Sequence, residues 1–271
     1  MENKHIEKIN EMERSLFSDP LTFKKAILFC FFTEGVLFAA QFIAYRLKFS
    51  FGFVPDILYL ASVLLLARII GKNELDEIFT WRSIPISIFA SLLIMFFGFE
   101  ILMLELHNLF FILLPVTDGF FNNRFFKPDN VILLMIAVGI FPGFTEEIFF
   151  RGIIERRFLR TFSPVKAILL SSLIFGIMHL NPWQAVIAFL NGLFTGWLYW
   201  RYRSIWLCMF IHAYYNILVT LLPLPYDNVI SNFGNIWHFP FWFIILGVIL
   251  FVLGLLMVIV LSRTEKAASA E

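Results

Sequence analysis

The feature that most constrains this sequence is a series of eight long apolar stretches. Each is close to the ~20 residues that an α-helix needs to cross the ~30 Å of hydrocarbon in a bilayer. Lipid offers no hydrogen bonds to an exposed backbone, so segments of this kind fold as helices. Continuous apolar runs also exclude a membrane β-barrel, whose strands alternate in hydrophobicity. The stretches lie at about 26–46, 53–71, 84–106, 131–155, 165–180, 183–202, 204–222 and 239–262.

The composition of the 271-residue chain agrees with a membrane protein of many spans. Apolar residues make up 60% of the chain and charged residues 15%, against about 45–50% and about 25% in soluble domains. A soluble globule of this size needs more polar surface than such a chain provides. We therefore predict an all-α polytopic membrane protein, a bundle of about eight transmembrane helices with an intramembrane polar cavity.

Net charge and cysteine content add only exclusions. The formal net charge is +1 and no long basic run is present, so nothing points to a nucleic-acid partner. Cys30 and Cys208 both lie inside apolar stretches, where we expect them to pack as small side chains and to form no disulfide framework. The first 25 residues carry both signs of charge and lack the short apolar core of a cleavable signal.

Lysine and arginine gather on one side of the predicted spans. They precede the first span and follow the fourth, sixth and eighth, whereas the loops on the other side hold few. Because cytoplasmic loops are enriched in these residues, we predict an integral, multi-pass membrane protein with both termini cytoplasmic. No internal repeat is visible in the sequence, which disfavours an inverted-repeat transporter.

This organisation predicts three parts of the chain. Residues 1–25 form a cytoplasmic N-terminal tail, whose apolar spacing equally fits a helix on the membrane surface. Residues 26–262 form a single membrane domain, in which residues 131–220 hold most of the polar motifs. Residues 263–271 form a cytoplasmic C-terminal tail.

Ionisable side chains inside a membrane cost about 2.5–3.5 kcal/mol each on insertion scales, so each one needs a partner or a function. The densest group lies in the fourth span: Glu146, Glu147 and Arg151. In an α-helix Glu147 and Arg151 lie on nearly the same side, in the favourable order for an ion pair. Glu146 lies about 140° from Arg151 and is left without a cation. We therefore predict a structural ion pair at Glu147 and a free carboxylate at Glu146, suited to a general base.

Two histidines are candidate partners of this carboxylate. His179 ends the fifth span, and a straight helical hairpin places it at nearly the depth of Glu146. His212 lies in the seventh span, with Asn216 one turn further on the same face. Matching the depth of His212 requires a tilt, a broken helix or an offset turn, and the sequence does not choose among them. The alternative is that these polar residues hold helices together, so both interpretations stay open at this point.

Three motifs among these residues resemble those of the CAAX-protease and bacteriocin-processing family, also called the Abi family, of intramembrane glutamate-type endopeptidases. The resemblance covers residues 131–220 and shows no departure at a family catalytic position. The motifs are Glu-Glu-x-x-x-Arg at residues 146–151, Phe-x-x-x-His at 175–179 and His-x-x-x-Asn at 212–216, with the paired small residues Gly192 and Gly196 before the last.

The resemblance implies an endopeptidase with an eight-helix membrane core that cleaves a membrane-associated or lipidated peptide or protein. In the mechanism that the resemblance implies, Glu146 is the base and His179 its partner in activating a water. His212 and Asn216 then stabilise the oxyanion of the tetrahedral intermediate. The remaining motif residues take supporting roles: Glu147, Arg151 and Phe175.

Two alternatives accompany this interpretation. The resemblance favours a metal-free mechanism, so no cofactor is expected, but zinc held by Glu146, His179 and His212 is the less favoured possibility, since the chain has no His-Glu-x-x-His helix. The second alternative is a non-catalytic membrane scaffold or regulator with a protease-like fold, because a fold does not fix a function. The expected partners are a substrate and the lipid bilayer. Glu34 and Glu100, deep in the first and third spans, are assigned no function.

Overall fold

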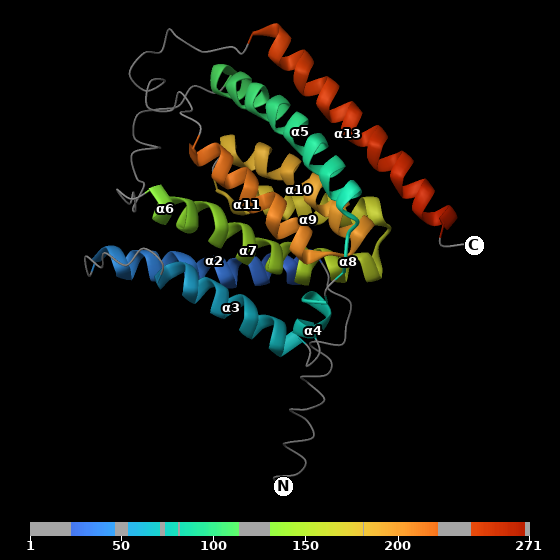
Figure 1. Cartoon of the computed structure of the whole chain (residues 1–271). Helices are drawn as coiled ribbons and strands as arrows, with labels where there is room; N and C mark the ends of the chain where they lie inside the picture. The colour runs from blue at the N-terminus through green and yellow to red at the C-terminus, as the bar shows by residue number, and fades with distance from the viewer. Residues whose placement is uncertain are drawn as a thin grey trace. The chain divides into compact units, whose positions relative to one another are not determined.

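The computed structural model is helical throughout its regular structure (Figure 1). It describes residues 23–46, 54–70, 74–80, 82–113, 131–180, 182–221 and 240–268. All eight predicted apolar stretches are helical over most of their length, which confirms the all-α fold. The last helix continues to Ala268, so the predicted C-terminal tail is largely helical, whereas the predicted N-terminal tail lies almost wholly outside the described residues.

The helices take their labels from Figure 1, with two π-helical segments named η1 and η2. They are α2 (Phe23–Arg46), α3 (Val54–Ile70), α4 (Glu74–Ile78), α5 (Ile86–Leu113), α6 (Val131–Leu134), η1 (Met135–Ile140), α7 (Phe141–Glu147), η2 (Ile148–Glu155), α8 (Arg156–Thr161), α9 (Pro164–Met178), α10 (Pro182–Tyr202), α11 (Ile205–Leu221) and α13 (Phe241–Ala268).

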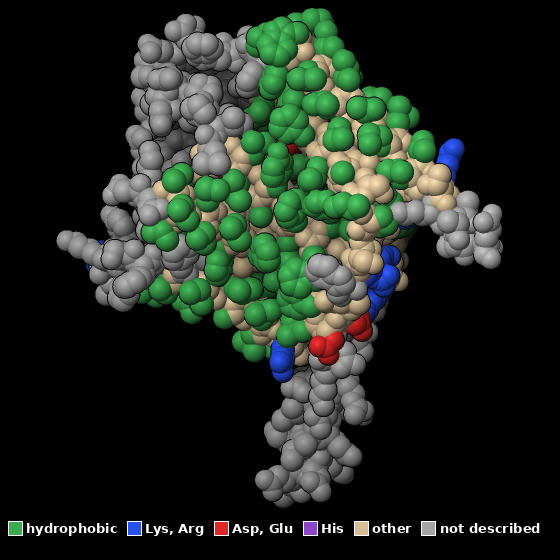
Figure 2. Space-filling view, viewed as in Figure 1, with side chains coloured by type: hydrophobic (Ala, Val, Ile, Leu, Met, Phe, Trp, Pro, Cys, Tyr) green, Lys and Arg blue, Asp and Glu red, His purple; other side chains and the backbone are tan. Residues whose placement is uncertain are grey.

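Length and composition identify membrane-crossing candidates among these helices. Four segments of the described chain are long and apolar enough to span a bilayer: Lys24–Ile43, Ile86–Leu106, Val131–Thr161 and Phe241–Thr264. Large apolar side chains face outward on them, as at Phe38, which is 72% exposed, and Phe241, which is 76% exposed. Figure 2 shows one face on which hydrophobic side chains predominate and charged ones gather near α4. Such a surface suits a lipid environment, as expected of an integral membrane protein.

The chain divides into two compact units. The first comprises residues 1–81 and 128–213, and the second comprises residues 82–127 and 214–271. Helix α11 therefore begins in the first unit and ends in the second. All three sequence motifs lie in the first unit, apart from the end of the last one.

Close packing in the first unit depends on glycines between α9 and α10, which lie against each other (Figure 1). A Cβ atom on Gly176 would lie 2.6 Å from the carbonyl oxygen of Ala185, and one on Gly192 would lie 3.0 Å from Cβ of Ser172. Helices α2 and α3 form a second pair. The chain from Val131 to Thr161 packs against α3, α4, α9 and α10.

The second unit is built on α5 and α13, which run side by side (Figure 1). Here too glycines let the helices approach, because a Cβ atom on Gly98 would collide with the backbone nitrogen of Phe251. A Cβ atom on Gly254 would likewise collide with the backbone nitrogen of Met95. Small residues of this kind are common where membrane helices pack.

The segment from Val131 to Thr161 is one continuous helix whose winding changes along its length. It passes through α6, η1, α7, η2 and α8, whereas the sequence analysis assumed regular α-helix. Pro142 follows η1 and has no N–H to donate, which relaxes the preceding turn. No comparable sequence signal marks η2, all of whose residues are buried. Wide turns of this type occur frequently at functional sites.

Candidate active site

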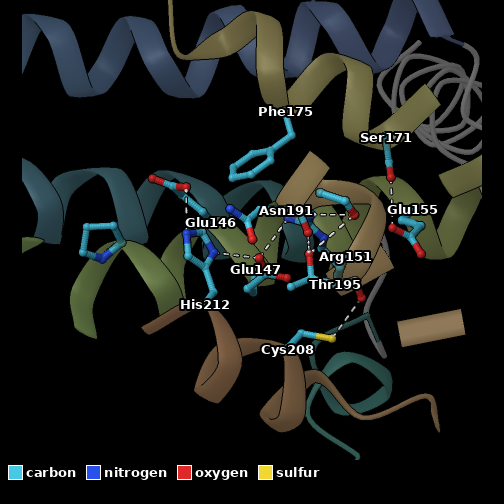
Figure 3. Close-up of polar contacts among 12 residues, drawn as sticks. Glu146, Glu147, Arg151, Glu155, Ser171, Phe175, Asn191, Thr195, Cys208 and His212 are labelled. Carbon is cyan, nitrogen blue, oxygen red and sulfur yellow. Dashed lines mark hydrogen bonds and ion pairs between the residues drawn. The ribbon is translucent and has the colours of Figure 1, made fainter. Parts of the chain in front are cut away.

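Glu147 is the centre of a buried polar network at the end of α7. Its Oε1 accepts a hydrogen bond from Nη1 of Arg151 at 2.9 Å, and Nδ1 of His212 lies 2.7 Å from the same oxygen (Figure 3). The Glu147 and Arg151 side chains are 0% and 1% exposed. Nη2 of Arg151 donates onward to the carbonyl oxygen of Gly192 on α10, at 3.2 Å. The network therefore ties three helical segments together, and it contains the predicted Glu147–Arg151 ion pair.

Glu146 lies beside the same histidine. Its Oε2 is 3.8 Å from Nε2 of His212, and its side chain is 24% exposed. His212 thus has one glutamate at each ring nitrogen, with the buried Glu147 at Nδ1 and the more accessible Glu146 at Nε2 (Figure 3). Of the two acids, Glu146 is the one that a substrate or a water can reach more easily.

This arrangement differs from the expected separation of the two glutamates. An α-helical projection left Glu146 facing elsewhere and gave Glu147 a purely structural role, but both side chains reach His212. Two features produce the difference. The helix widens into η2 directly after Glu147, and α7 approaches α11 closely, since a Cβ atom on Gly143 would lie 2.7 Å from the backbone nitrogen of Ala213.

Phe175 brings the second motif to this network. Its ring packs edge-on against His179, with centroids 4.8 Å apart, and against His212, with centroids 5.8 Å apart. The guanidinium carbon of Arg151 lies 4.7 Å from the centre of the same ring, a cation–π distance. One aromatic side chain therefore fixes the spacing of both histidines and the arginine.

His179 caps the end of α9. Its Nδ1 lies 2.9 Å from the carbonyl oxygen of Phe175, and a carbonyl only accepts, so Nδ1 carries the proton. In the neutral ring Nε2 is then a hydrogen-bond acceptor. Among the described residues no direct hydrogen bond or ion pair joins His179 to Glu146. Leu180 follows with φ 51°, a left-handed conformation that ends the helix abruptly.

Comparison with known proteins identifies this region. Residues 128–218 match a family model described as type II CAAX prenyl endopeptidase, Rce1-like. The matched segment is similar to the Rce1-like CAAX proteases. This confirms the resemblance seen in the sequence motifs, all of which lie inside the matched residues. The comparisons with curated proteins and with solved structures found no match. Similarity to this family suggests a membrane endopeptidase that acts on a peptide or protein at the membrane.

Asn216 completes the last of the three motifs, on α11. It lies one helical turn after His212 on the same helix, and its backbone carbonyl accepts a hydrogen bond from Oγ1 of Thr220 at 2.6 Å. Because residues four apart share a helix face, the amide lies on the side of α11 that carries His212. The catalytic roles assigned to Glu146, His179, His212 and Asn216 stay predictions.

The spacing of the possible metal ligands can be compared with what a metal ion needs. Among the described residues, no three His, Cys, Asp or Glu side chains gather closely enough to hold one. The zinc alternative through Glu146, His179 and His212 therefore lacks an assembled ligand set in this arrangement. The expectation that the mechanism needs no cofactor stays a prediction.

Sequence reasoning missed three further polar contacts of the helix from Val131 to Thr161. Glu155 is fully buried and accepts a hydrogen bond from Oγ of Ser171 at 2.9 Å, which ties η2 to α9. On α4, Glu77 pairs with Arg156 and Arg160. Glu155 lies four residues after Arg151, and that spacing is a signal that could have placed it beside the network.

The two acids left without a function differ in their surroundings. Oε1 of Glu34 accepts a hydrogen bond from the hydroxyl of Tyr59 at 3.2 Å, which links α2 to α3. Glu100, in the second unit, is 1% exposed, and neither of its carboxyl oxygens has a hydrogen-bond partner among the described residues. The first acid therefore holds two helices together, and the second has no such contact.

Proposed function

We propose that this protein is an intramembrane endopeptidase that hydrolyses a peptide bond of a membrane-associated or lipidated peptide or protein. The observation that carries the proposal is the position of His212 between Glu146 and Glu147, with His179 on the same phenylalanine, inside the Rce1-like segment. Peptide hydrolysis requires a base near a water and donors near the developing oxyanion. These side chains provide both types of group.

In the proposed first step, Glu146 takes a proton from a water molecule while the water oxygen attacks the carbonyl carbon of the substrate. Nε2 of His179 can accept a hydrogen bond from the other O–H group of that water, because Nδ1 of His179 donates its proton to the Phe175 carbonyl. The two side chains then act through the water that they share, which is consistent with the absence of a direct bond between them in the described structure.

The second step is collapse of the tetrahedral intermediate. The carbon–nitrogen bond breaks, and Glu146 returns its proton to the leaving nitrogen, so that a carboxyl group and an amine are released. Until then the negative oxygen needs donors. The Asn216 amide can donate directly. His212 already uses Nδ1 toward Glu147, so it donates from Nε2 only when it carries a second proton.

The proposal can be tested by comparing cells that express the wild-type protein with cells that express Glu146→Gln. Gln keeps the shape of the side chain and removes the base. Peptides whose new termini appear only with the wild type are candidate substrates, and each is then cleaved by purified protein in lipid nanodiscs. Equal processing by both proteins would favour the scaffold alternative, in which the fold binds a membrane partner without cutting it.

A further inference from the structure

The buried network around Glu147 is unevenly bonded. Oε1 of Glu147 contacts both Arg151 and His212, whereas Oε2 is buried with no hydrogen-bond partner among the described residues. An ionised carboxylate accepts at both oxygens, and a buried polar atom left without a partner is uncommon in folded proteins. The carboxylate therefore has room for one more donor.

Asn191 on α10 has the complementary imbalance. The residue is 8% exposed, and neither its amide nitrogen nor its amide oxygen has a partner in the described part of the chain. Figure 3 shows the side chain extending from α10 in the direction of Glu146 and Glu147. A buried amide with two unused N–H groups thus points toward a buried carboxylate with an unused oxygen.

The backbone of α10 is anchored at this point. The carbonyl of Gly192, the next residue, accepts the hydrogen bond from Nη2 of Arg151 at 3.2 Å. The carbonyl of Asn191 itself accepts a hydrogen bond from Oγ1 of Thr195 at 2.9 Å. The main chain beside the network is therefore held at two neighbouring carbonyl groups, and the Asn191 side chain extends from this fixed backbone.

We propose that Asn191 is a positioning residue of the active site, whose amide donates a hydrogen bond to Oε2 of Glu147. A half-turn of the amide exchanges its nitrogen and oxygen without changing its shape. Glu147 is then gripped at one oxygen by Arg151 and His212 and at the other by Asn191. The bond does not depend on the proposed function, but its effect on reaction rate does.

The consequence for catalysis passes through His212. Nδ1 of His212 lies 2.7 Å from Oε1 of Glu147, and this contact orients the imidazole ring. A carboxylate held at both oxygens cannot swing, so Nε2 keeps its direction toward Glu146. Loss of the Asn191 donor loosens this geometry and lowers kcat, while KM stays nearly constant because Asn191 does not touch the substrate.

Two variants separate positioning from packing. Asn191→Leu has a similar volume and no hydrogen-bonding group. We expect its kcat to be about 10-fold below that of the wild type, which is the size of effect found when residues that orient metal ligands are lost. This ratio of the two kcat values should not vary with pH. Asn191→Asp keeps the shape, but it repels Glu147 when ionised and donates an O–H when protonated. Its kcat relative to the wild type should therefore recover as pH is lowered. Ser91→Ala, which removes a buried hydroxyl bonded to the carbonyl of Ser87 within α5, is the control and should stay within about twofold.

A second measurement needs no substrate. Thermal unfolding of Asn191→Leu, Glu147→Met and the double variant in nanodiscs gives a double-mutant cycle. We expect the shift caused by Asn191→Leu to shrink by more than half once Glu147 is replaced. Should Glu147→Met not fold, the pH series of Asn191→Asp decides.

Additive unfolding shifts, or a kcat per folded protein that is unchanged in Asn191→Leu, would overturn the proposal. A wild-type protein that cleaves no peptide would instead remove the proposed function. In that case the unfolding cycle still decides whether Asn191 binds Glu147.

Discussion

Both units of this protein pack helices closely at glycines, but they differ in the polar contacts that join their helices. In the first unit polar side chains cross from helix to helix: Arg151 links Glu147 to α10, His212 links it to α11, and Glu155 links η2 to α9 through Ser171. In the second unit α5 and α13 meet backbone to backbone at glycines, including Gly98.

The difference teaches what each kind of contact can specify. Within lipid there is little hydrophobic drive between helices, so packing and hydrogen bonds supply the association. A glycine contact sets the distance between two helices but gives no direction to any side chain. A network of hydrogen bonds sets the direction of each of its members, which chemistry requires. Four predictions test this contrast, in order of decreasing effect.

The largest effect is expected from Glu146→Ala. This acid makes no ion pair with arginine or lysine in the described structure, so its loss should spare the fold and remove the base. We expect the cleavage rate to fall about 10²- to 10⁴-fold with an unchanged unfolding temperature. Wild-type rates in a folded, purified sample would exclude Glu146 from the mechanism.

Arg151→Ala should affect stability and activity together. The change leaves the fully buried Glu147 with His212 as its remaining partner and removes the link to the Gly192 carbonyl. Breaking a buried pair in this way costs about 3–5 kcal/mol. Folded yield and thermal unfolding in nanodiscs measure the loss, and an unfolding temperature equal to that of the wild type would contradict it.

Gly98→Leu in the second unit should affect stability only. The added side chain has no space against the backbone of Phe251, and overpacking of this kind costs about 1–3 kcal/mol. We expect a lower unfolding temperature but an unchanged kcat for the protein that remains folded. A kcat of the folded protein that falls together with the unfolding temperature would contradict the contrast between the units.

The smallest effect is expected at Glu77, outside the membrane-spanning segments. Partial burial works against ionisation, but the hydrogen bonds and charges of Arg156 and Arg160 outweigh it and hold the pKa of Glu77 below its usual range. A lowered pKa stabilises the folded state at pH values above the pKa of the unfolded state, which is about 4.3. This stabilisation is lost as the pH falls through the pKa of the folded state. Unfolding temperatures of the wild type and Glu77→Gln should therefore converge in acid, and parallel curves would show that the pairs contribute nothing.

The sequence predicted those structural features that depend on a single helix. Apolar length located the helices, and the spacing of four residues placed Arg151 beside Glu147. It did not predict that His212 bonds to Glu147, because that contact depends on where two helices cross. The crossing is set by Gly143 against Ala213, a close approach that no periodicity reveals. Glu77 was missed for the same reason, since its two partners lie far along the chain.

The wide winding of η2 has a consequence for anyone who would build such a site anew. A π-helical turn contains more than four residues, so residues spaced by four fall slightly short of a full turn, and Glu147, Arg151 and Glu155 form a row that is fully buried. In a regular α-helix of the same sequence, residues spaced by four pass a full turn, so the row would drift around the axis in the opposite sense. Transplanting the motif onto an ideal helical scaffold would therefore reproduce its sequence without its geometry.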